Sequence, residues 1–345
     1  MPTIDLESIS SEEALLKCRI RDLPLKIEGT WLADCVAQLY QELREKGILF
    51  QPECYLADEW LTPEHEPVIG IPFYLAHPVL LRLEKKMMLE AEGETKDWCM
   101  KLLRHEAGHA LCYAYRLNRK KRWKSIFGSS SQEYGETYRF RPYSKSYVRH
   151  LDGFYAQYHP DEDFVESFAV WLTPGLDWEK RYQGWKALKK LRYVNELMAA
   201  LQGRTPLVLK GKKFWNLASL RISLKEFYKR KLQLRAEDFP EFHDGNLKKI
   251  FQEEASAKGA CSAGKLIEIY GKIILQDVSL WTGEKKYVIH GLLKDISKRC
   301  QALKLFIRQD ETLAVTQLAV YMTTLIMNYR YTGWYRGKIA RRKEL

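Results

Sequence analysis

The sequence lacks the long apolar run that a membrane-spanning helix requires. Such a helix needs about 18 or more consecutive apolar residues, and the most apolar stretch, 313–329, is interrupted by threonine, glutamine and asparagine. The first 21 residues carry four acidic side chains, where a signal peptide would have a basic head and an apolar core. We therefore expect no membrane segment and a cytoplasmic location.

Cysteine is scarce as well. Seven cysteines are scattered over 345 residues, and no two of them form a CxxC pair. This spacing offers neither a zinc ribbon nor a thioredoxin-type dithiol. A chain of this length with so few cysteines is not expected to depend on a disulfide framework. We expect most of the thiols to be buried as small apolar side chains.

The chain has apolar and charged residues in ordinary globular proportions, at 46% and 29%, but its charge is unevenly distributed. Residues 1–178 contain 22 basic and 28 acidic side chains, whereas residues 179–345 contain 34 basic and 16 acidic ones. The net charge of +12 therefore arises entirely in the second half. A basic half would suit an acidic partner, although solvated basic faces on helices explain it equally simply.

Hydrophobic periodicity predicts a predominantly helical α+β chain in three parts. We expect an N-terminal helical region over 1–60 and a second domain with a small sheet over 61–205. A basic helical bundle over 206–345 would follow a boundary near the Gly-Arg-Thr-Pro segment that begins at Gly203. Within the middle part, Val68–Leu75 is β-prone and contains a proline, which favours an edge strand.

The periodicity also predicts individual helices. We expect residues 118–150 to be irregular. One helix should begin at Ser11. Further helices should cover approximately 31–47, 78–90, 95–117, 160–173, 178–201, 222–236, 245–257, 263–281, 286–308 and 311–330.

The most informative segment is an HExxH motif, His105-Glu106-Ala107-Gly108-His109. On a helix, residues four apart share a face, so both imidazoles can reach one metal ion. Zinc suits this arrangement because it takes nitrogen and oxygen ligands in tetrahedral geometry. Glu106 is then placed to contact a metal-bound water as general base. The alternative, two core histidines and a buried glutamate on an otherwise apolar helix, would leave a costly unpaired carboxylate.

A third protein ligand is needed if the fourth position is to stay open for water. A close-spaced third histidine is excluded because Cys112 and Tyr115 occupy the corresponding positions. The glutamates at 133 and 136 have no helix to aim them. Glu162 and Glu166 lie four apart on one face of a predicted helix, where two carboxylates are mildly unfavourable unless they are used. One could bind the metal while the other orients a ligand histidine, and His159 is a further candidate.

The two segments together resemble the gluzincin branch of the zincin metallopeptidases. HEAGH is followed about 50 residues later by HPDEDFVESFAVWL, beginning at His159. The pair is most similar to bacterial zinc-binding metallopeptidases whose second motif has the form HPxEDxAExxA. The resemblance covers roughly residues 65–175. It implies a zincin-like catalytic domain with zinc held by His105, His109 and Glu162.

The same resemblance implies roles for three further residues. Glu106 would be the general base, and Glu166 the carboxylate that orients a ligand. The E-x-x-x-E spacing is also similar to that of lethal-factor-like toxin peptidases, in which a tyrosine seven residues before the ligand glutamate donates to the oxyanion. Tyr155 stands at that position. Tyr158, Tyr147, His150 and ordinary aromatic packing are alternatives for that role.

We therefore expect a zinc-dependent metallopeptidase that hydrolyses a peptide or protein substrate. One alternative is a zinc-stabilised binding or regulatory protein without hydrolysis, because a fold does not certify an activity. Another is a peptidase tethered through its basic half to an acidic partner such as nucleic acid. This tethered peptidase is disfavoured because the basic residues are not gathered into a nucleic-acid-binding motif.

Overall fold

The computed structural model describes residues 5–9, 11–132, 141, 143–233, 243–253, 261–308 and 310–332. These residues form two compact units. The first contains the described residues up to Tyr228 except Met87–Glu90, and the second contains those four and the described residues beyond Tyr228. None of the described helices is long and apolar enough to cross a membrane.

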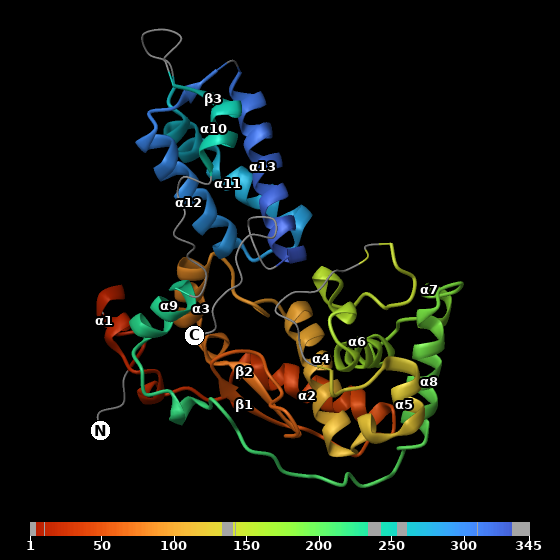
Figure 1. The fold of residues 1–345 in the computed structure, drawn as a ribbon. Coiled ribbons are helices and arrows are strands. Elements are labelled where there is room, and N and C mark those ends of the chain that lie inside the picture. Colours follow the sequence, from red (N-terminus) through yellow and green to blue (C-terminus); the bar gives the residue numbers. More distant parts are fainter. Residues whose placement is uncertain are drawn as a thin grey trace. The chain divides into compact units, whose positions relative to one another are not determined.

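The first unit is predominantly helical, as expected (Figure 1). The helices that begin in it are α1 (Glu12–Lys17), α2 (Trp31–Glu45), α3 (Pro78–Met88), α4 (Lys96–Ala114), α5 (Lys121–Phe127), α6 (Pro160–Leu172), α7 (Trp178–Arg181), α8 (Ala187–Ala199) and α9 (Leu224–Gln233). Short 3₁₀ segments lie between several of them. Two of these segments are used below, η2 (Phe73–Ala76) and η4 (Asp152–Gln157).

The sheet of this unit is a parallel pair of strands, β1 (Glu53–Ala57) and β2 (Val68–Pro72), drawn side by side in Figure 1. The expected strand is thus present, but it ends at Pro72, and the η2 turn replaces its last residues. Leu61 and Gly70 exchange backbone hydrogen bonds of 3.3 and 2.8 Å, an isolated bridge to β2. Gly70 leaves room for this bridge, since a Cβ there would lie 2.5 Å from a Leu61 methyl group.

Helix α4 carries the HExxH motif through the interior of the first unit. Thr95 caps its start by accepting a hydrogen bond from the Trp98 amide, and both of its motif histidines lie in the second half. Arg104, immediately before the motif, makes two hydrogen bonds of 2.7 Å to the buried carboxylate of Glu42 on α2. This bidentate pair fixes α4 against α2, because a guanidinium and a carboxylate match in geometry.

Helix α6 lies against α4 and is buried along its whole length. His159 caps it, and Pro160 occupies its first turn, where a missing N–H costs nothing. The two helices meet closely at Gly108, where an added Cβ would lie 3.0 Å from Val165 Cγ1 and 3.2 Å from Val165 Cα. The glycine of the HExxH motif therefore lets α6, which carries Glu162 and Glu166, approach α4.

The second unit contains the helical bundle expected from the sequence. Its helices are α10 (Asp244–Ile250), α11 (Ala263–Thr282), α12 (Lys286–Ala302) and α13 (Glu311–Thr332). Two-residue strands, β3 (Phe251–Gln252) and β4 (Phe306–Ile307), pair antiparallel at one end. Its buried core includes Ile274 of α11, Leu293 of α12 and Leu318 of α13.

The structure differs from the sequence-based expectations in several places. The 1–60 region contains β1 besides its helices, and the stretch expected to be irregular contains α5. The helix expected over 178–201 is interrupted by a turn in which Gly184 has φ +77°, so α7 and α8 are separate. The helix expected over 245–257 ends at Ile250, where β3 begins, and 254–257 lie outside the described residues.

The boundary expected at 205/206 lies inside the first compact unit, which continues to Tyr228. The segment beyond 205 is held there by backbone contacts. The amides of Leu207 and Val208 both donate to the carbonyl of Ala114, at 2.9 and 3.1 Å. Residues 1–60 belong to the same unit, since β1 forms half of its sheet.

Candidate metal centre

The structure brings His105, His109 and Glu162 together in the interior of the first unit. One potential ligand atom from each residue lies within 4.8 Å of the other two, and all three residues are buried. Glu162 Oε2 is 3.2 Å from His105 Nε2 and 3.4 Å from His109 Nε2. Helix α4 supplies the histidines and α6 supplies the carboxylate.

These separations fit the edges of a metal-coordination tetrahedron. With metal–ligand bonds of roughly 2.0–2.2 Å, neighbouring ligand atoms lie roughly 3.3–3.6 Å apart. Charge-assisted hydrogen bonds are shorter, at about 2.7–2.9 Å. Two imidazole nitrogens and one carboxylate oxygen are also a donor set that suits zinc. The residues therefore fit a zinc ion by both spacing and chemistry.

Glu166 lies on the other side of the His105 ring. Its Oε1 accepts a hydrogen bond of 2.8 Å from His105 Nδ1, and its Oε2 accepts one of 2.9 Å from the Leu151 amide. Both oxygens are thus engaged away from the His105 and His109 Nε2 atoms. Glu166 is placed to orient a ligand rather than to be one.

His159, the remaining candidate for third ligand, has both ring nitrogens engaged elsewhere. Nδ1 accepts a hydrogen bond of 3.1 Å from the Asp161 amide, and Nε2 lies 2.9 Å from the carbonyl oxygen of Gln132. It caps the start of α6 and is not part of the three-residue cluster. The glutamates at 133 and 136 lie outside the described residues.

Opposite charges hold the three ligand candidates together. Burial favours the neutral form of His105, but hydrogen bonds and charges from Glu162 and Glu166 outweigh it and raise the pKa of His105 well above 6.5. Burial also opposes protonation of His109, whose pKa is nevertheless raised by Glu162. Burial disfavours the charge on Glu162, yet His109 and His105 hold its pKa below the usual range. A cation at this point would replace the protons on the two imidazoles.

A cavity of about 750 Å³ opens beside the cluster. His105, Glu106, His109, Glu162 and Tyr155 all line it, so the expected general base shares a wall with the ligand candidates. Glu106 is itself buried, and its carbonyl accepts a hydrogen bond of 3.1 Å from the Thr62 hydroxyl. This bond connects α4 to the segment at Leu61 that bridges to β2.

Tyr155 reaches the site from the η4 turn. Its ring lies 5.5 Å from the His105 ring, measured between centroids. Tyr158 contacts Tyr155 but does not line the cavity; Tyr147 contacts Lys190, and His150 lies 2.9 Å from the carbonyl of Lys101. Of the four residues considered for the oxyanion role, Tyr155 is thus the one in the cavity wall within the described part of the chain.

The sequence did not point to several residues that line the cavity. Tyr113 stacks on the His109 ring at 6.4 Å, and Asp161 precedes the third ligand candidate. Tyr113 follows His109 by four residues, so helical spacing could have found it. Trp60 and Thr62 lie far from both motifs in sequence, and no local pattern marks them. No residue of Val68–Pro72 is among the described residues that line the cavity. Residues of the Trp60–Glu64 segment line it instead.

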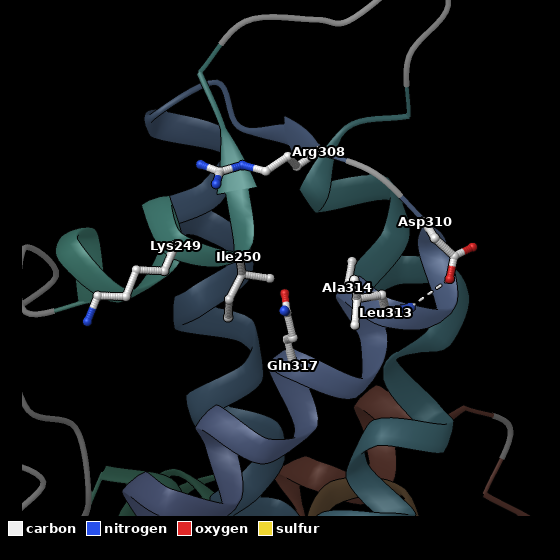
Figure 2. Close-up of a pocket in the computed structure, with 7 residues that line it drawn as sticks. All are labelled: Lys249, Ile250, Arg308, Asp310, Leu313, Ala314 and Gln317. Atoms are coloured by element: carbon white, nitrogen blue, oxygen red, sulfur yellow. Dashed lines mark hydrogen bonds between the residues drawn. The ribbon is translucent and has the colours of Figure 1, made fainter.

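A second, smaller hollow of about 130 Å³ lies in the second unit, between α10 and the start of α13 (Figure 2). Its arginine, Arg308, donates hydrogen bonds to the carbonyls of Lys248 and Phe251. Asp310 accepts from the Leu313 amide, the dashed contact in Figure 2. These polar groups serve the local backbone, and the hollow contains no cluster able to hold a metal among the described residues.

Comparisons with known proteins add no relative. The chain matches no protein-family model, no curated protein and no solved structure.

Proposed function

We propose that this chain is a zinc-dependent peptidase that cleaves peptide bonds with a water nucleophile. The observation that carries the proposal is that His105, His109 and Glu162 bring ligand atoms within 4.8 Å of one another, in the wall of a cavity of about 750 Å³ that Glu106 also lines. The HExxH motif and the second acidic motif, distant in sequence, meet there. Their resemblance to the gluzincin motifs supports the same conclusion.

In this mechanism each protein group has a separate task. His105, His109 and Glu162 would hold the metal, and Glu166 keeps the His105 ring oriented with Nε2 toward the site. Zinc, when bound, lowers the pKa of a coordinated water and polarises the substrate carbonyl. Glu106 receives a proton at its carboxylate as water attacks and passes it to the departing amine. Tyr155, which lines the same cavity, would donate a hydrogen bond to the developing oxyanion.

Replacing Glu106 with glutamine tests the mechanism. Glu106→Gln should keep one zinc per chain, since Glu106 is not a ligand, while peptide hydrolysis falls by about 10²- to 10⁴-fold, the usual contribution of a general base. Glu179→Gln, an exposed change in an ion pair with Arg192, is the matched control and should retain full activity. Full turnover in Glu106→Gln would overturn the mechanism.

The same experiment addresses a zinc-stabilised binding protein without hydrolysis. Such a protein would retain zinc and show the same biological output in wild type and Glu106→Gln. An acidic partner for the basic half of the chain stays a prediction, because the described residues of the second unit show no cluster of basic side chains that would bind one. Salt-dependent binding of the full chain to duplex or single-stranded DNA would support that partner.

A further inference from the structure

Asp161 is a buried carboxylate in the wall of the cavity. It is 8% exposed, and its Oδ1 has no hydrogen-bond partner within the described residues. Neither a metal ligand nor the general base, it has no task in the mechanism above. An ionised carboxylate is costly to bury unless a positive group or hydrogen-bond donor compensates it. Asp161 lines the cavity, so such a group would approach it from there.

Neighbouring histidines compensate Asp161 only in part, because burial raises the pKa of Asp161 although the charges of His159 and His109 act to lower it. His159 Nδ1 lies 3.7 Å from Asp161 Oδ2, but that nitrogen already accepts the Asp161 amide at 3.1 Å. The ring proton therefore sits on Nε2, which donates to the carbonyl of Gln132. In this arrangement neither ring N–H of His159 points at the Asp161 carboxylate.

The cavity as a whole is acidic. Its described lining includes four carboxylates, Glu64, Glu106, Asp161 and Glu162, and neither lysine nor arginine. A divalent ion would neutralise only two of these charges. This contrasts with the chain as a whole, which has a net charge of +12. An acidic, partly closed cavity attracts cationic ligands because low-dielectric walls focus its field.

Tyr113 adds an aromatic ring to the acidic lining of the cavity. Its ring stacks on His109 and lines the cavity. Burial raises the pKa of Tyr113, and the charges of Asp161 and Glu64 raise it further, so both carboxylates act on this ring. Cations bind over aromatic rings as well as to carboxylates. Tyr155, in contrast, contacts the other histidine ring.

We propose that the cavity holds a subsite for a positively charged group of the substrate, an ammonium or guanidinium, between Asp161, Glu64 and Tyr113 on the His109 side. The proposal rests on the proposed peptidase function, for which it names the substrate class. The cation is a lysine or arginine side chain next to the scissile bond, or a free α-amine at the peptide terminus. The two sources share one recognition chemistry and are separated by the substrates below.

The test compares paired peptides cleaved by the zinc-loaded full chain. Each pair differs by lysine against norleucine next to the scissile bond, and each peptide is made with a free and an acetylated N-terminus. We expect kcat/KM to favour the cationic member by about tenfold or more, as for hydrogen bonds to charged groups. A lysine preference that persists on acetylation would assign the subsite to the side chain, whereas faster cleavage of the free than of the acetylated peptide, whichever residue it carries, would assign it to the α-amine.

Asp161→Asn should bring the cationic-to-neutral ratio close to one, and Glu64→Gln should lower it less, since Glu64 is exposed. Glu179→Gln, outside the cavity, should keep the wild-type ratio. A role of Asp161 limited to the start of α6 would lower stability without changing this ratio. An unchanged ratio in Asp161→Asn, or a wild type that prefers neither lysine over norleucine nor a free over an acetylated N-terminus, would overturn the subsite.

Binding measured without turnover separates this inference from the proposed function. Zinc-loaded Glu106→Gln is titrated with the same fluorescently labelled peptides, and the double variant with Asp161→Asn is the comparison. Asp161-dependent preference for the cationic peptide, with no cleavage of any peptide by the wild type, would retain the subsite and reject the peptidase. Cleavage without any such preference would retain the peptidase and reject the subsite.

Discussion

His105 donates a hydrogen bond of 2.8 Å from Nδ1 to the carboxylate of Glu166, a residue 61 positions later in the chain. The contact joins α4 to α6 and leaves Nε2 of the same ring facing Glu162. The Leu151 amide holds the other oxygen of Glu166. One carboxylate therefore fixes both the ring orientation and the tautomer that a metal ligand needs.

Removing that carboxylate should weaken metal binding without abolishing it. In Glu166→Ala we expect zinc affinity to fall by about 10- to 100-fold, as is usual when the partner of a ligand histidine is lost. Competition with a chromophoric chelator measures the change. Glu196→Ala, an exposed change on α8, is the control. Unchanged affinity in Glu166→Ala would show that the contact does not tune the site.

The close approach of α4 and α6 should make Gly108 intolerant of a side chain. Alanine is the better helix former by about 1 kcal/mol, but overpacking costs about 1–3 kcal/mol, and the backbone of Val165 limits relief. We expect Gly108→Ala to lower both the free energy of unfolding and zinc affinity. Gly291→Ala on α12, with open space around its Cβ, should be neutral or stabilising. Denaturant unfolding of both variants measures this, and a stabilised Gly108→Ala would contradict the packing.

The two cavity tyrosines should respond differently to removal of the hydroxyl group. Tyr155→Phe should retain zinc and lower kcat by about 10²- to 10³-fold, the cost of one oxyanion donor. Tyr113→Phe keeps the ring that faces His109 and should lower kcat much less. Steady-state kinetics on one peptide compares them. A larger loss in Tyr113→Phe would move the oxyanion role to Tyr113, and equal losses would contradict Tyr155 as the single donor.

Stabilisation of the protein by zinc should increase with pH. The pKa values of His105 and His109 are raised in the folded state, so their ion pairs with Glu162 stabilise the metal-free protein fully below pH 6.5, and this contribution is lost as pH rises through the raised values. The lowered pKa of Glu162 keeps it ionised until far more acidic pH. Zinc must displace the two protons. We expect the zinc-dependent rise in Tm to be smallest near pH 6 and to grow above it; a pH-independent rise would contradict this coupling.

The sequence predicted the parts of the site that depend on local geometry. The spacing of His105 and His109 places both on one helical face whatever the surroundings, and α4 does present both to the cavity. The choice between Glu162 and Glu166 could not be made from spacing, since both project from one face of α6. It depends on how α6 docks at Gly108, a tertiary contact that sets which carboxylate faces Nε2.

Non-local contacts also account for the parts of the fold that the sequence did not predict. Strand β1 is short and is stabilised by pairing with β2. The local pattern of residues 1–60, which predicted helices, therefore did not indicate it. Asp161 is distinguished by burial without a hydrogen-bond partner for Oδ1, which no sequence pattern shows. Helices α11 and α13 were predicted closely, whereas the helices expected over 245–257 and 286–308 end at Ile250 and Ala302, and the short strands β3 and β4 that follow them pair with each other, a contact that local periodicity does not show.

Zinc content, measured by elemental analysis of the purified protein after reconstitution, tests the central claim most directly. We expect one zinc per chain in the wild type and in Glu64→Ala, a carboxylate change in the same cavity, and a sharp loss of zinc in Glu162→Ala. Absence of stoichiometric zinc from the wild type, or full retention in Glu162→Ala, would contradict the three-residue centre.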